Sequence, residues 1–347
     1  MIGASRAFRT LRGARWLSSG TSAFPPPRLF DYGTITANLS VADAIPAVEN
    51  AFGELAKGKV EVPMPMHIGI PESANAGPGD CHVKGGYVVG TPTFTVKVAT
   101  VSFYKNLENN LPPGAGVFVV NSAVTGTPLG IFQENRFMTD LRTGAAGAVA
   151  FKHFASPKTQ KVGFIGCGAI AKNMARAAAA ISPNFEGVAF APPGGGADEF
   201  ADEMSKELSI PFTVAPSAEN LCMSSDVIFT QTPGSTTVVE KDWLKPHCTI
   251  IASGSDQPTK NEIPVDVLKA SKYVSDLTGQ CIKLGELRSA VASGDMTEGD
   301  VYAEIGEVVA GMKPGREGDE LVVVDLTGTG AQDAAIGQVA WDKLSGM

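Results

Sequence analysis

The chain has 347 residues, of which 44% are hydrophobic and 18% charged, and its formal net charge is −8. This length allows two domains of ordinary size, and the acidic balance argues against a nucleic acid or an anionic membrane surface as partner, while no apolar run of about eighteen residues is present to span a membrane. Five cysteines without a CxxC pair and four histidines without ligand spacing argue against a disulfide framework and a metal site.

The first 23 residues differ in composition from the rest of the chain. Residues 1–23 contain four arginines, Arg6, Arg9, Arg12 and Arg15, and the first acidic residue of the chain is Asp31. A basic, serine-bearing, acid-free and amphipathic start is typical of an organellar transit peptide, and we expect import into mitochondria and removal of residues 1–23. The alternative is a disordered tail on a cytoplasmic protein. Cleavage would change the net charge from −8 to −12, because it removes four arginines and no acid.

Residues 24–141 read as a mainly antiparallel sheet with one or two helices. A helix is predicted over 40–60, with Ser40 and Asp43 as capping residues. Short runs rich in β-branched and aromatic residues follow, separated by turn signals such as Thr-Gly-Thr-Pro. The predicted strands lie within 64–70, 81–90, 93–103 and 116–133.

From about residue 138 the pattern changes to alternating helices and strands. An alanine-rich helix over 139–155 is followed by strands at 161–166, 187–191, 212–215, 226–232, 248–254 and 272–276. Helices are predicted between the first of these strands, at 169–181, 197–208 and 217–225. This alternation predicts an α/β fold with a doubly wound parallel sheet. The last strand, 320–328, and the last helix, 331–344, could rejoin the first domain and make it discontinuous.

A phosphate-binding turn is predicted directly after the strand at 161–166. Gly166, Gly168 and Ala171 form a G-x-G-x-x-A pattern that opens a helix. Gly166 permits the tight turn, Gly168 lets the backbone approach a pyrophosphate, and Ala171 lets helix and strand pack closely. The helix start also offers free N–H groups and a partial positive charge. The sequence therefore predicts a dinucleotide site, the alternative being a glycine turn in an unliganded domain.

The choice between NAD and NADP is left open by the second strand. This strand ends at Phe190 and Ala191 and runs into Pro-Pro-Gly-Gly-Gly, without the acidic residue that binds a ribose 2′-hydroxyl and without an arginine for a 2′-phosphate. The missing carboxylate slightly favours tolerance of NADPH.

Four further segments combine polar groups with glycine: HVKGG with Lys84, FTVKVA with Lys97, FMTDLRTGAA with Arg142 and Thr143, and GSDQPTKNE with Asp256. A lysine within an apolar strand is costly to bury unless it is paired or used. Each residue also has a structural interpretation: a solvent-facing strand lysine, a surface or capping arginine, or an aspartate that caps a helix.

Together these segments resemble the ornithine cyclodeaminase/μ-crystallin family. The stretch from VKVA through NRFMTDLRTGAAGAVA is similar to the family's lysine strand, substrate loop and helix start. VGFIGCGAIA resembles its nucleotide loop, GSDQPTKNE its G-x-D-x-P-x-K-x-E signature, and DLTGTGAQDAA its C-terminal segment. The resemblance implies a Rossmann-type sheet, here 142–321, inserted into a discontinuous α+β substrate-binding and dimerisation domain, here 24–141 and 322–347, and it implies a homodimer.

The resemblance also implies residue roles. Lys97 and Arg142 would hold a substrate carboxylate, Lys84 would face the substrate, and Asp256 would exchange a proton with the substrate nitrogen. We take Asp256 and Lys97 as the catalytic candidates, with no metal. NAD or NADP(H) would be the cofactor, and its candidate binding residues are Gly166, Gly168, Ala169, Ile170, Ala171, Thr143, Thr232 and Ser253.

Three functions follow from the resemblance. The first is conversion of L-ornithine to L-proline and ammonia. The second is NAD(P)H-dependent reduction of an imine or ketimine, and the third is binding of NADP and a small ligand without turnover, as in μ-crystallin. True ornithine cyclodeaminases usually carry an arginine in an early V-P-x-R segment, where this chain has Met64. This departure weakens the case for ornithine, and a small amino or imino acid remains the expected substrate class.

Overall fold

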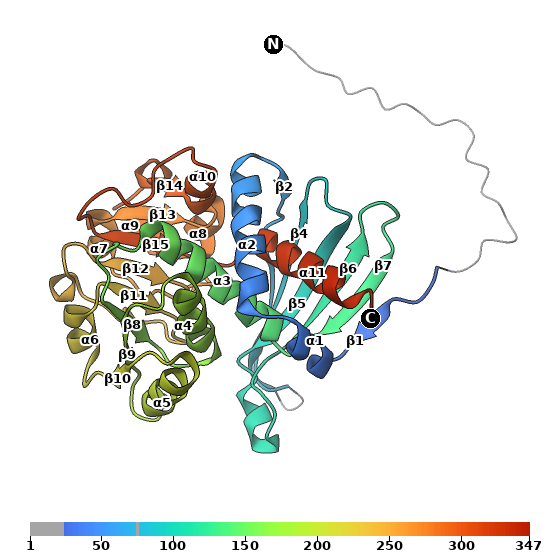
Figure 1. Ribbon diagram of the computed structural model, residues 1–347, viewed down its shortest axis with the longest axis horizontal. Coiled ribbons are helices and arrows are strands. Elements are labelled where there is room, and N and C mark those ends of the chain that lie inside the picture. Colours follow the sequence, from blue (N-terminus) through green and yellow to red (C-terminus); the bar gives the residue numbers. More distant parts are fainter. Residues whose placement is uncertain (1–23, 74–75) are drawn as a thin grey trace, which may run out of the picture.

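A computed structural model describes residues 24–73 and 76–347, so the predicted transit peptide, residues 1–23, lies outside the described residues. The chain forms two units, each built on its own β-sheet, which lie side by side (Figure 1). Within the described ranges, no helix is long and apolar enough to cross a membrane.

The first unit contains a seven-stranded sheet. Its order is β1-β7-β6-β5-β4-β2, with β3 paired to β4. All pairs are antiparallel except β1 with β7, which confirms the mainly antiparallel sheet predicted for this region. The strands are β1 (Arg28–Phe30), β2 (Val60–Glu61), β3 (Met66–Ile70), β4 (Gly79–Val88), β5 (Thr93–Val101), β6 (Ala115–Ser122) and β7 (Pro128–Gln133).

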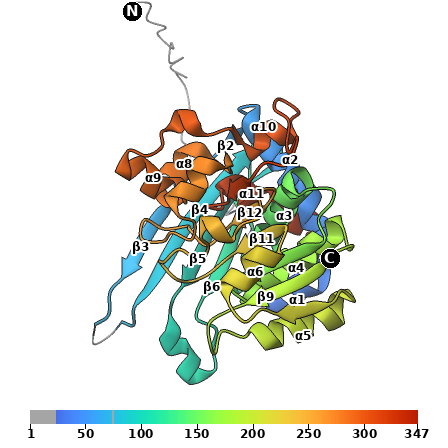
Figure 2. The ribbon, with the colours of Figure 1, turned by 90° about the vertical axis from the view of Figure 1, so that its left-hand side faces the viewer.

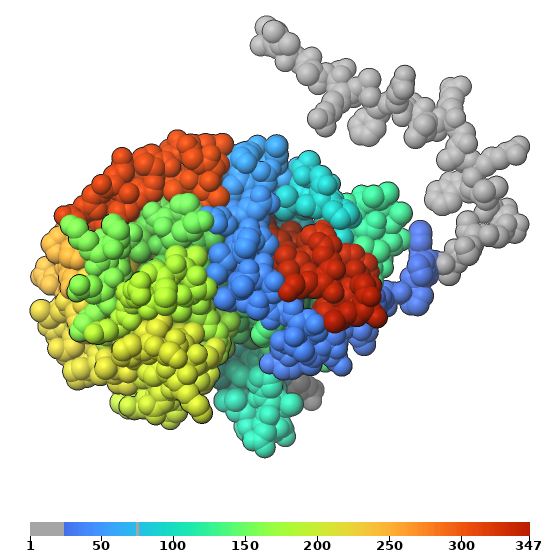
Figure 3. All heavy atoms as spheres, viewed as in Figure 1, coloured from blue at the N-terminus to red at the C-terminus, as the bar shows by residue number. Residues whose placement is uncertain are grey.

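Helices cover one face of this sheet. The C-terminal helix α11 (Gly330–Leu344) packs on β4 and β5, and α2 (Val41–Ala56) packs beside it. In the space-filling view, α2 stands between the two units and α11 lies next to it (Figure 3). The predicted capping residues of α2 form a capping box, in which the Asp43 carboxylate accepts from the Ser40 N–H at 2.9 Å. The remaining helices are α1 (Tyr32–Asn38) and the short η1 (Tyr104–Asn109).

The second unit contains an eight-stranded parallel sheet. Its order is β10-β9-β8-β11-β12-β15-β13-β14, which confirms the doubly wound α/β fold. The chain runs outward from β8 to β10 and then returns to place β11 on the other side of β8. Ligands of such sheets bind at this switch point, beyond the carboxyl ends of the strands. The strands are β8 (Lys161–Ile165), β9 (Glu186–Phe190), β10 (Phe212–Val214), β11 (Val227–Thr230), β12 (Thr249–Ala252), β13 (Lys272–Ser275), β14 (Ala303–Glu304) and β15 (Val322–Asp325).

Helices flank this parallel sheet, and α3 (Phe137–Phe154) joins the units because it packs against both α2 and α4 (Ala169–Ile181). Turned by 90°, the molecule shows β3, β4 and η1 extending past the second unit (Figure 2). The other helices are α5 (Ala197–Leu208), α6 (Ala218–Ser224), η2 (Lys241–Trp243), α7 (Val265–Ala270), α8 (Thr278–Leu284), α9 (Leu287–Ser293), η3 (Glu298–Asp300) and α10 (Ile305–Val309).

The predicted start of the returning segment at residue 322 is wrong. The strand that begins there, β15, pairs in parallel with both β12 and β13 inside the second sheet. Its residues are all buried, and a short continuous run of valines suits a strand that is covered on both faces. The chain therefore returns to the first unit only after Asp325.

Candidate active site

The two units meet at a cavity that contains all four residues predicted to act on a substrate. Lys84 and Lys97 come from β4 and β5, Arg142 from α3, and Asp256 from the loop after β12. The same cavity is lined by His82, Ala99, Val101, Arg136, Thr139, Thr143, Ile170, Ser253, Leu326, Thr327 and Gly328.

The two lysines face the protein interior, so the solvent-facing interpretation is wrong for both. Lys84 and Lys97 are directly opposite each other in the β4–β5 ladder and are 6% and 1% exposed. Val96, the neighbour of Lys97, points to the opposite face of the sheet and is 37% exposed. In β5 the polar side of the strand is therefore the buried side, which is the reverse of an ordinary half-buried strand.

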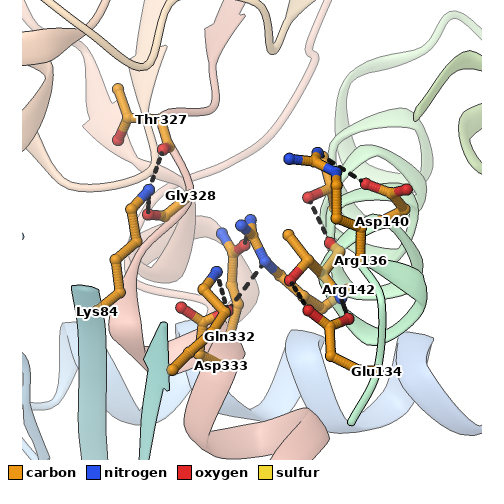
Figure 4. A network of polar contacts seen from close by, with 12 residues as sticks. Lys84, Glu134, Arg136, Asp140, Arg142, Thr327, Gly328, Gln332 and Asp333 are labelled. Carbon is orange, nitrogen blue, oxygen red and sulfur yellow. Dashed lines mark hydrogen bonds and ion pairs between the residues drawn. The ribbon is translucent and has the colours of Figure 1, made fainter. Parts of the chain in front are cut away.

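A buried carboxylate that the sequence analysis did not assign joins Lys97 to Arg142. Asp333 lies in the first turn of α11 and is 0% exposed. Its Oδ1 lies 2.9 Å from Lys97 Nζ and 3.1 Å from Arg142 Nε. Arg142 also donates from one terminal nitrogen to Gln332 Oε1 at 2.8 Å (Figure 4). The only sequence signal was the DLTGTGAQDAA segment itself, which contains Gln332 and Asp333.

Lys84 is held by the loop between β15 and α11. Its Nζ donates to the carbonyl oxygens of Thr327 at 3.1 Å and Gly328 at 2.9 Å (Figure 4). Gly328 has φ +77°, and a Cβ atom there would lie 2.6 Å from a terminal nitrogen of Arg142. Because both the backbone conformation and the space favour glycine, this position allows Lys84 and Arg142 to lie close together.

These contacts leave the cavity with unmatched positive charge. Lys84, Lys97 and Arg142 are buried, and Asp333 is the one carboxylate that pairs with any of them among the described residues. Burial lowers the pKa of Lys97 to about 7, although Asp333 acts in the opposite direction, and burial also lowers the pKa of Lys84. An anionic ligand would restore the charged state of both lysines.

Asp256 occupies the edge where the sequence placed it, beyond the carboxyl end of β12. Its Oδ1 lies 3.0 Å from Lys260 Nζ, and its side chain is 35% exposed, toward the cavity. Burial acts to raise its pKa, but the positive charges of Lys260 and Lys84 outweigh that effect and the net pKa is lowered. Asp256 is therefore an ionised carboxylate at neutral pH.

The predicted phosphate turn has the geometry that a pyrophosphate needs. Gly166 has φ +92°, and a Cβ atom there would lie 2.8 Å from the Gln231 carbonyl oxygen. Gly168 is the N-cap of α4 with φ −80°, and a Cβ atom there would meet no atom within 4 Å. The space in front of Gly168 is thus open, while Ala171 is fully buried against the sheet. The residues present fit a dinucleotide.

The other cofactor candidates connect this turn to the substrate cavity. A channel lined by Ala169, Ile170, Thr232 and Ser253 shares Ile170, Ser253 and Asp256 with the substrate cavity. Thr143 lines the substrate cavity, and its hydroxyl donates to the Thr139 carbonyl oxygen at 2.8 Å. A second cavity, also lined by Gly168, extends past Phe190 and Ala191. Glu240 is the one charged residue among those that line this second cavity.

Glu262 is a second residue that the sequence analysis did not assign. It ends the GSDQPTKNE segment and is 0% exposed. Its carboxylate accepts from the Thr232 N–H at 2.6 Å and from the Gly254 N–H at 3.0 Å. Glu262 therefore ties the Asp256 loop to the channel. No cluster of three or more acidic, histidine or cysteine residues in the described part of the chain could hold a metal ion.

Comparison with known proteins identifies the family. Residues 31–347 match the ornithine cyclodeaminase/mu-crystallin family. The chain is 34% identical over 304 residues to a dehydrogenase-like protein of Rhizobium meliloti, with 87% of this chain and 91% of the relative covered. It is 33% identical over 306 residues to the alanine dehydrogenase of Archaeoglobus fulgidus, with 88% and 91% covered.

Three solved structures share the fold. An archaeal alanine dehydrogenase dimer with bound NAD has a TM-score of 0.84 at 31% identity and covers 92% of this chain and 96% of its own. The Δ1-pyrroline-2-carboxylate reductase of Thermococcus litoralis, in complex with NADH and L-proline, has a TM-score of 0.83 at 28% identity, with 92% and 98% covered. The iminosuccinate reductase of Paracoccus denitrificans, in complex with NAD⁺, has a TM-score of 0.82 at 26% identity, with 92% and 97% covered.

Proposed function

Because this chain belongs to the ornithine cyclodeaminase/mu-crystallin family, we propose that it is an NAD(P)-dependent enzyme that interconverts a carboxylated imine and the corresponding amino acid. The observation that carries this proposal is the buried group of Lys84, Lys97 and Arg142, in which Lys97 and Arg142 share the carboxylate of Asp333 and Lys84 contacts only backbone carbonyl oxygens. Buried charges without partners are costly, so the group is completed by an anion from the substrate.

In the proposed reaction, the residues of the cavity have separate roles. A bound reduced dinucleotide supplies a hydride to the imine carbon. Arg142 and Lys97 hold the substrate carboxylate, which fixes the reacting carbon in one orientation. The ionised Asp256 lies beside the nitrogen, where it stabilises the protonated imine. In the reverse direction Asp256 accepts a proton from the amine.

Cyclodeamination of L-ornithine is the second reaction to consider, because the family is named for it. Ornithine would bring a second ammonium group into a cavity that already holds excess positive charge. Among the residues that line the cavity, Asp256 is the one carboxylate, and it is already paired with Lys260. The geometry therefore supports imine reduction better than ornithine binding.

NAD(H) suits the adenosine end better than NADP(H). The residues that line this end include Phe190, Ala191 and the glycine-rich loop after them, with no lysine or arginine among them. A 2′-phosphate would gain no cationic partner there. We expect NADH to bind more tightly than NADPH, since the one charged residue that lines this end is the acidic Glu240.

A turnover assay tests the proposal. The protein would be incubated with NADH in three separate reactions, which contain Δ1-pyrroline-2-carboxylate, pyruvate with ammonia, or oxaloacetate with ammonia. The absorbance of NADH and the amount of amino acid product would be followed in each. L-ornithine with NAD⁺ and release of ammonia forms the parallel arm. Reduction of at least one imine supports the proposal, and proline from ornithine would favour the cyclodeaminase instead. Dinucleotide binding without turnover of any compound would indicate a binding protein.

The same assay tests Asp256. Asp256→Asn keeps the size of the side chain but removes its charge, so turnover should fall by about 10²–10⁴-fold. Arg142→Lys should instead weaken substrate binding more than it lowers turnover, because a lysine cannot make the bidentate contact. Near-full turnover of Asp256→Asn would reduce Asp256 to a structural partner of Lys260.

A further inference from the structure

The substrate cavity has a second polar end that the proposed reaction does not use. The residues of β5 that line the cavity are, in order along the strand, Lys97, Ala99 and Val101. Lys97 belongs to the end that carries Arg142 and Lys84. Arg136 and His82 line the same cavity further along the strand, since His82 is paired with Ala99 in the ladder.

Arg136 has an unusual backbone conformation for its side chain. It precedes α3 with φ +74°, in the left-handed region, where glycine or asparagine is favoured over a long side chain. Strained positions of this kind cluster at functional sites because the side chain is needed where the strain places it. Arg136 lines both the substrate cavity and the channel that leads to Gly168.

The Arg136 guanidinium has donors to spare. One terminal nitrogen donates to Asp140 Oδ1 at 3.0 Å, which is its one side-chain partner among the described residues (Figure 4). A guanidinium carries five N–H donors in a planar fork that matches a carboxylate. In Figure 4, Arg136 and Lys84 lie on opposite sides of Arg142. The remaining donors of Arg136 are free to bind a ligand that Arg142 holds at its other end.

The small side chain of Ala99, opposite His82 in the ladder, lines this second end. Gly116, on the other side of Ala99, makes room for the buried Glu134 carboxylate instead, because a Cβ atom there would clash with Glu134 Oε1. Gly114 makes room for Arg136 itself, because a Cβ atom there would lie 2.9 Å from Arg136 Cδ.

His82 adds an unused polar group at this end. Its side chain is buried, and its Nε2 has no hydrogen-bond partner among the residues that the structure describes. Burial lowers the pKa of His82 to about 4, so the ring is neutral at pH 7 and can donate one hydrogen bond. A buried polar atom that lines a cavity and lacks a partner indicates that a ligand supplies one.

We propose that Arg136 and His82 form a subsite for a second carboxylate, so that the substrate is the imine of a 2-oxo dicarboxylic acid and the product a dicarboxylic amino acid of aspartate or glutamate size. This inference rests on the proposed function. Lys97 and Arg142 hold the carboxylate beside the reacting carbon, and Arg136 holds the distal one. The hydride from the reduced dinucleotide adds to the carbon of the protonated C=N bond, which becomes a C–N single bond, and the dinucleotide is oxidised.

The competing role for Arg136 is a contact to the dinucleotide pyrophosphate, because Arg136 also lines the channel toward Gly168. The two roles predict different losses. A substrate-subsite arginine affects the kcat/KM of dicarboxylic imines and leaves NADH affinity unchanged. A pyrophosphate-binding arginine weakens NADH binding and affects every substrate equally.

The test compares substrates on the wild type, Arg136→Gln, Arg136→Lys and Arg136→Gly. Oxaloacetate and 2-oxoglutarate, each with ammonia, supply the dicarboxylic imines, and pyruvate with ammonia supplies the matched monocarboxylic imine. We expect the wild type to prefer a dicarboxylic imine by about tenfold or more in kcat/KM. Arg136→Gln should lower that kcat/KM by about 10–100-fold, as for loss of a charge-assisted hydrogen bond, and should lower the kcat/KM of the pyruvate reaction much less.

Two variants distinguish the effect of losing the Arg136 guanidinium from the effect of the left-handed backbone conformation. Arg136→Gly relieves the left-handed strain, so a dicarboxylate-specific loss in this variant comes from the missing guanidinium, and Arg136→Lys should restore part of the preference. Arg176→Gln, on the solvent side of α4 where Arg176 pairs with Glu207, serves as the control for loss of an arginine. The inference is overturned if the wild type prefers pyruvate, if Arg136→Gln affects all imines alike, or if NADH affinity falls in this variant. A wild type that reduces pyruvate with ammonia but no dicarboxylic imine keeps the proposed function and loses the subsite, whereas no turnover of any imine removes both.

Discussion

At the scale of single residues, the protonation state of Lys97 affects how tightly the site binds a carboxylate. Burial lowers its pKa to about 7, against the opposing effect of Asp333 and with Arg142 and Lys84 as further positive neighbours. The ammonium form is present below this pKa and is lost as the pH rises through it. We therefore expect kcat/KM, which reports the free enzyme, to fall above about pH 7.

The substitution Lys97→Arg tests this assignment. A guanidinium stays charged across the accessible pH range, so the alkaline fall should move upward or disappear, at a lower maximal rate because the new side chain does not fit the same space. The pH profile of kcat/KM is measured with the same imine on both proteins. Because the titration of the substrate then affects both profiles equally, a difference between them comes from the protein. An unchanged alkaline midpoint in Lys97→Arg would assign the titration to another group.

Two glycines of the phosphate turn should respond differently to substitution. At Gly168 the backbone is ordinary and the space in front is open, so Gly168→Val should fold normally and lose dinucleotide affinity by about a hundredfold or more. At Gly166 the positive φ and the Gln231 carbonyl oppose any side chain, so Gly166→Ala should lower the free energy of unfolding by about 1–3 kcal/mol. Calorimetric titration with NADH and urea unfolding measure the two effects. Equal NADH affinity in Gly168→Val would disprove the phosphate assignment.

At the scale of elements, buried acidic side chains link the strands behind the active site. Asp325 at the end of β15 accepts from the Tyr273 hydroxyl at 2.6 Å and from the Glu286 N–H at 2.8 Å. Its other oxygen is buried and has no partner in the described part of the chain, and burial raises the pKa of Asp325 to about 7. Glu286 beside it has a pKa raised to about 8, again chiefly by burial. These groups hold the loops that carry Glu262 and, through it, the Asp256 loop.

This arrangement predicts a pH-dependent stability. Between about pH 4, the unfolded pKa of an aspartate, and pH 7, the folded state binds more protons than the unfolded state, so the free energy of unfolding decreases as the pH rises. Asp325→Asn keeps an oxygen for Tyr273 and cannot ionise, so it should flatten this decrease. Urea unfolding at pH 5 and pH 8 measures the difference for both proteins. An equally steep decrease in Asp325→Asn would place the responsible group elsewhere in the network.

At the scale of the whole molecule, one face of the first sheet is apolar, and no helix within residues 24–73 and 76–347 covers it. Leu29, Ile131, Val119 and Val96 lie in register across β1, β7, β6 and β5, and Leu29 is 69% exposed. We propose that a second copy of the chain covers this face in a homodimer, since an apolar surface of this kind on a symmetric oligomer is self-complementary.

The dimer predicts a mass of two chains at micromolar concentration by light scattering. Val96→Lys should shift the protein toward monomers, because it places a charge in the centre of the buried face. Val124→Lys, in the exposed turn between β6 and β7, is the matched control and should leave the mass unchanged. A wild type that is monomeric throughout this concentration range would refute the proposal.

The location in the cell is likewise a property of the whole chain. We propose mitochondrial import directed by residues 1–23, on the basis of the four arginines and the absence of acids before Asp31. A fluorescent reporter fused to residues 1–30 should accumulate in mitochondria, and the same fusion with the four arginines replaced by glutamine should remain in the cytosol. A cytosolic signal from the unaltered fusion would favour the disordered-tail interpretation.

The sequence by itself determined the features that depend on local order along the chain. The alternation of strands and helices after residue 138 predicts a parallel sheet, and the G-x-G-x-x-A pattern predicts the open turn at Gly168. Lys84, Lys97, Arg142 and Asp256 stand in short polar segments that break apolar runs, so each could be selected before any contact was known. Such patterns are readable because secondary structure and turn geometry are set by neighbours a few residues apart.

Tertiary structure alone decided which distant residues complete the site. Asp333 pairs with Lys97 across 236 positions of sequence, and no local pattern marks it as a buried counter-ion. The inward orientation of Lys97 and the place of β15 in the second sheet depend on which face another element covers. Arg136 resembles a surface arginine until its left-handed backbone and its place in the cavity are seen. Charge pairing and burial are set by distance in space, which the order of residues does not contain.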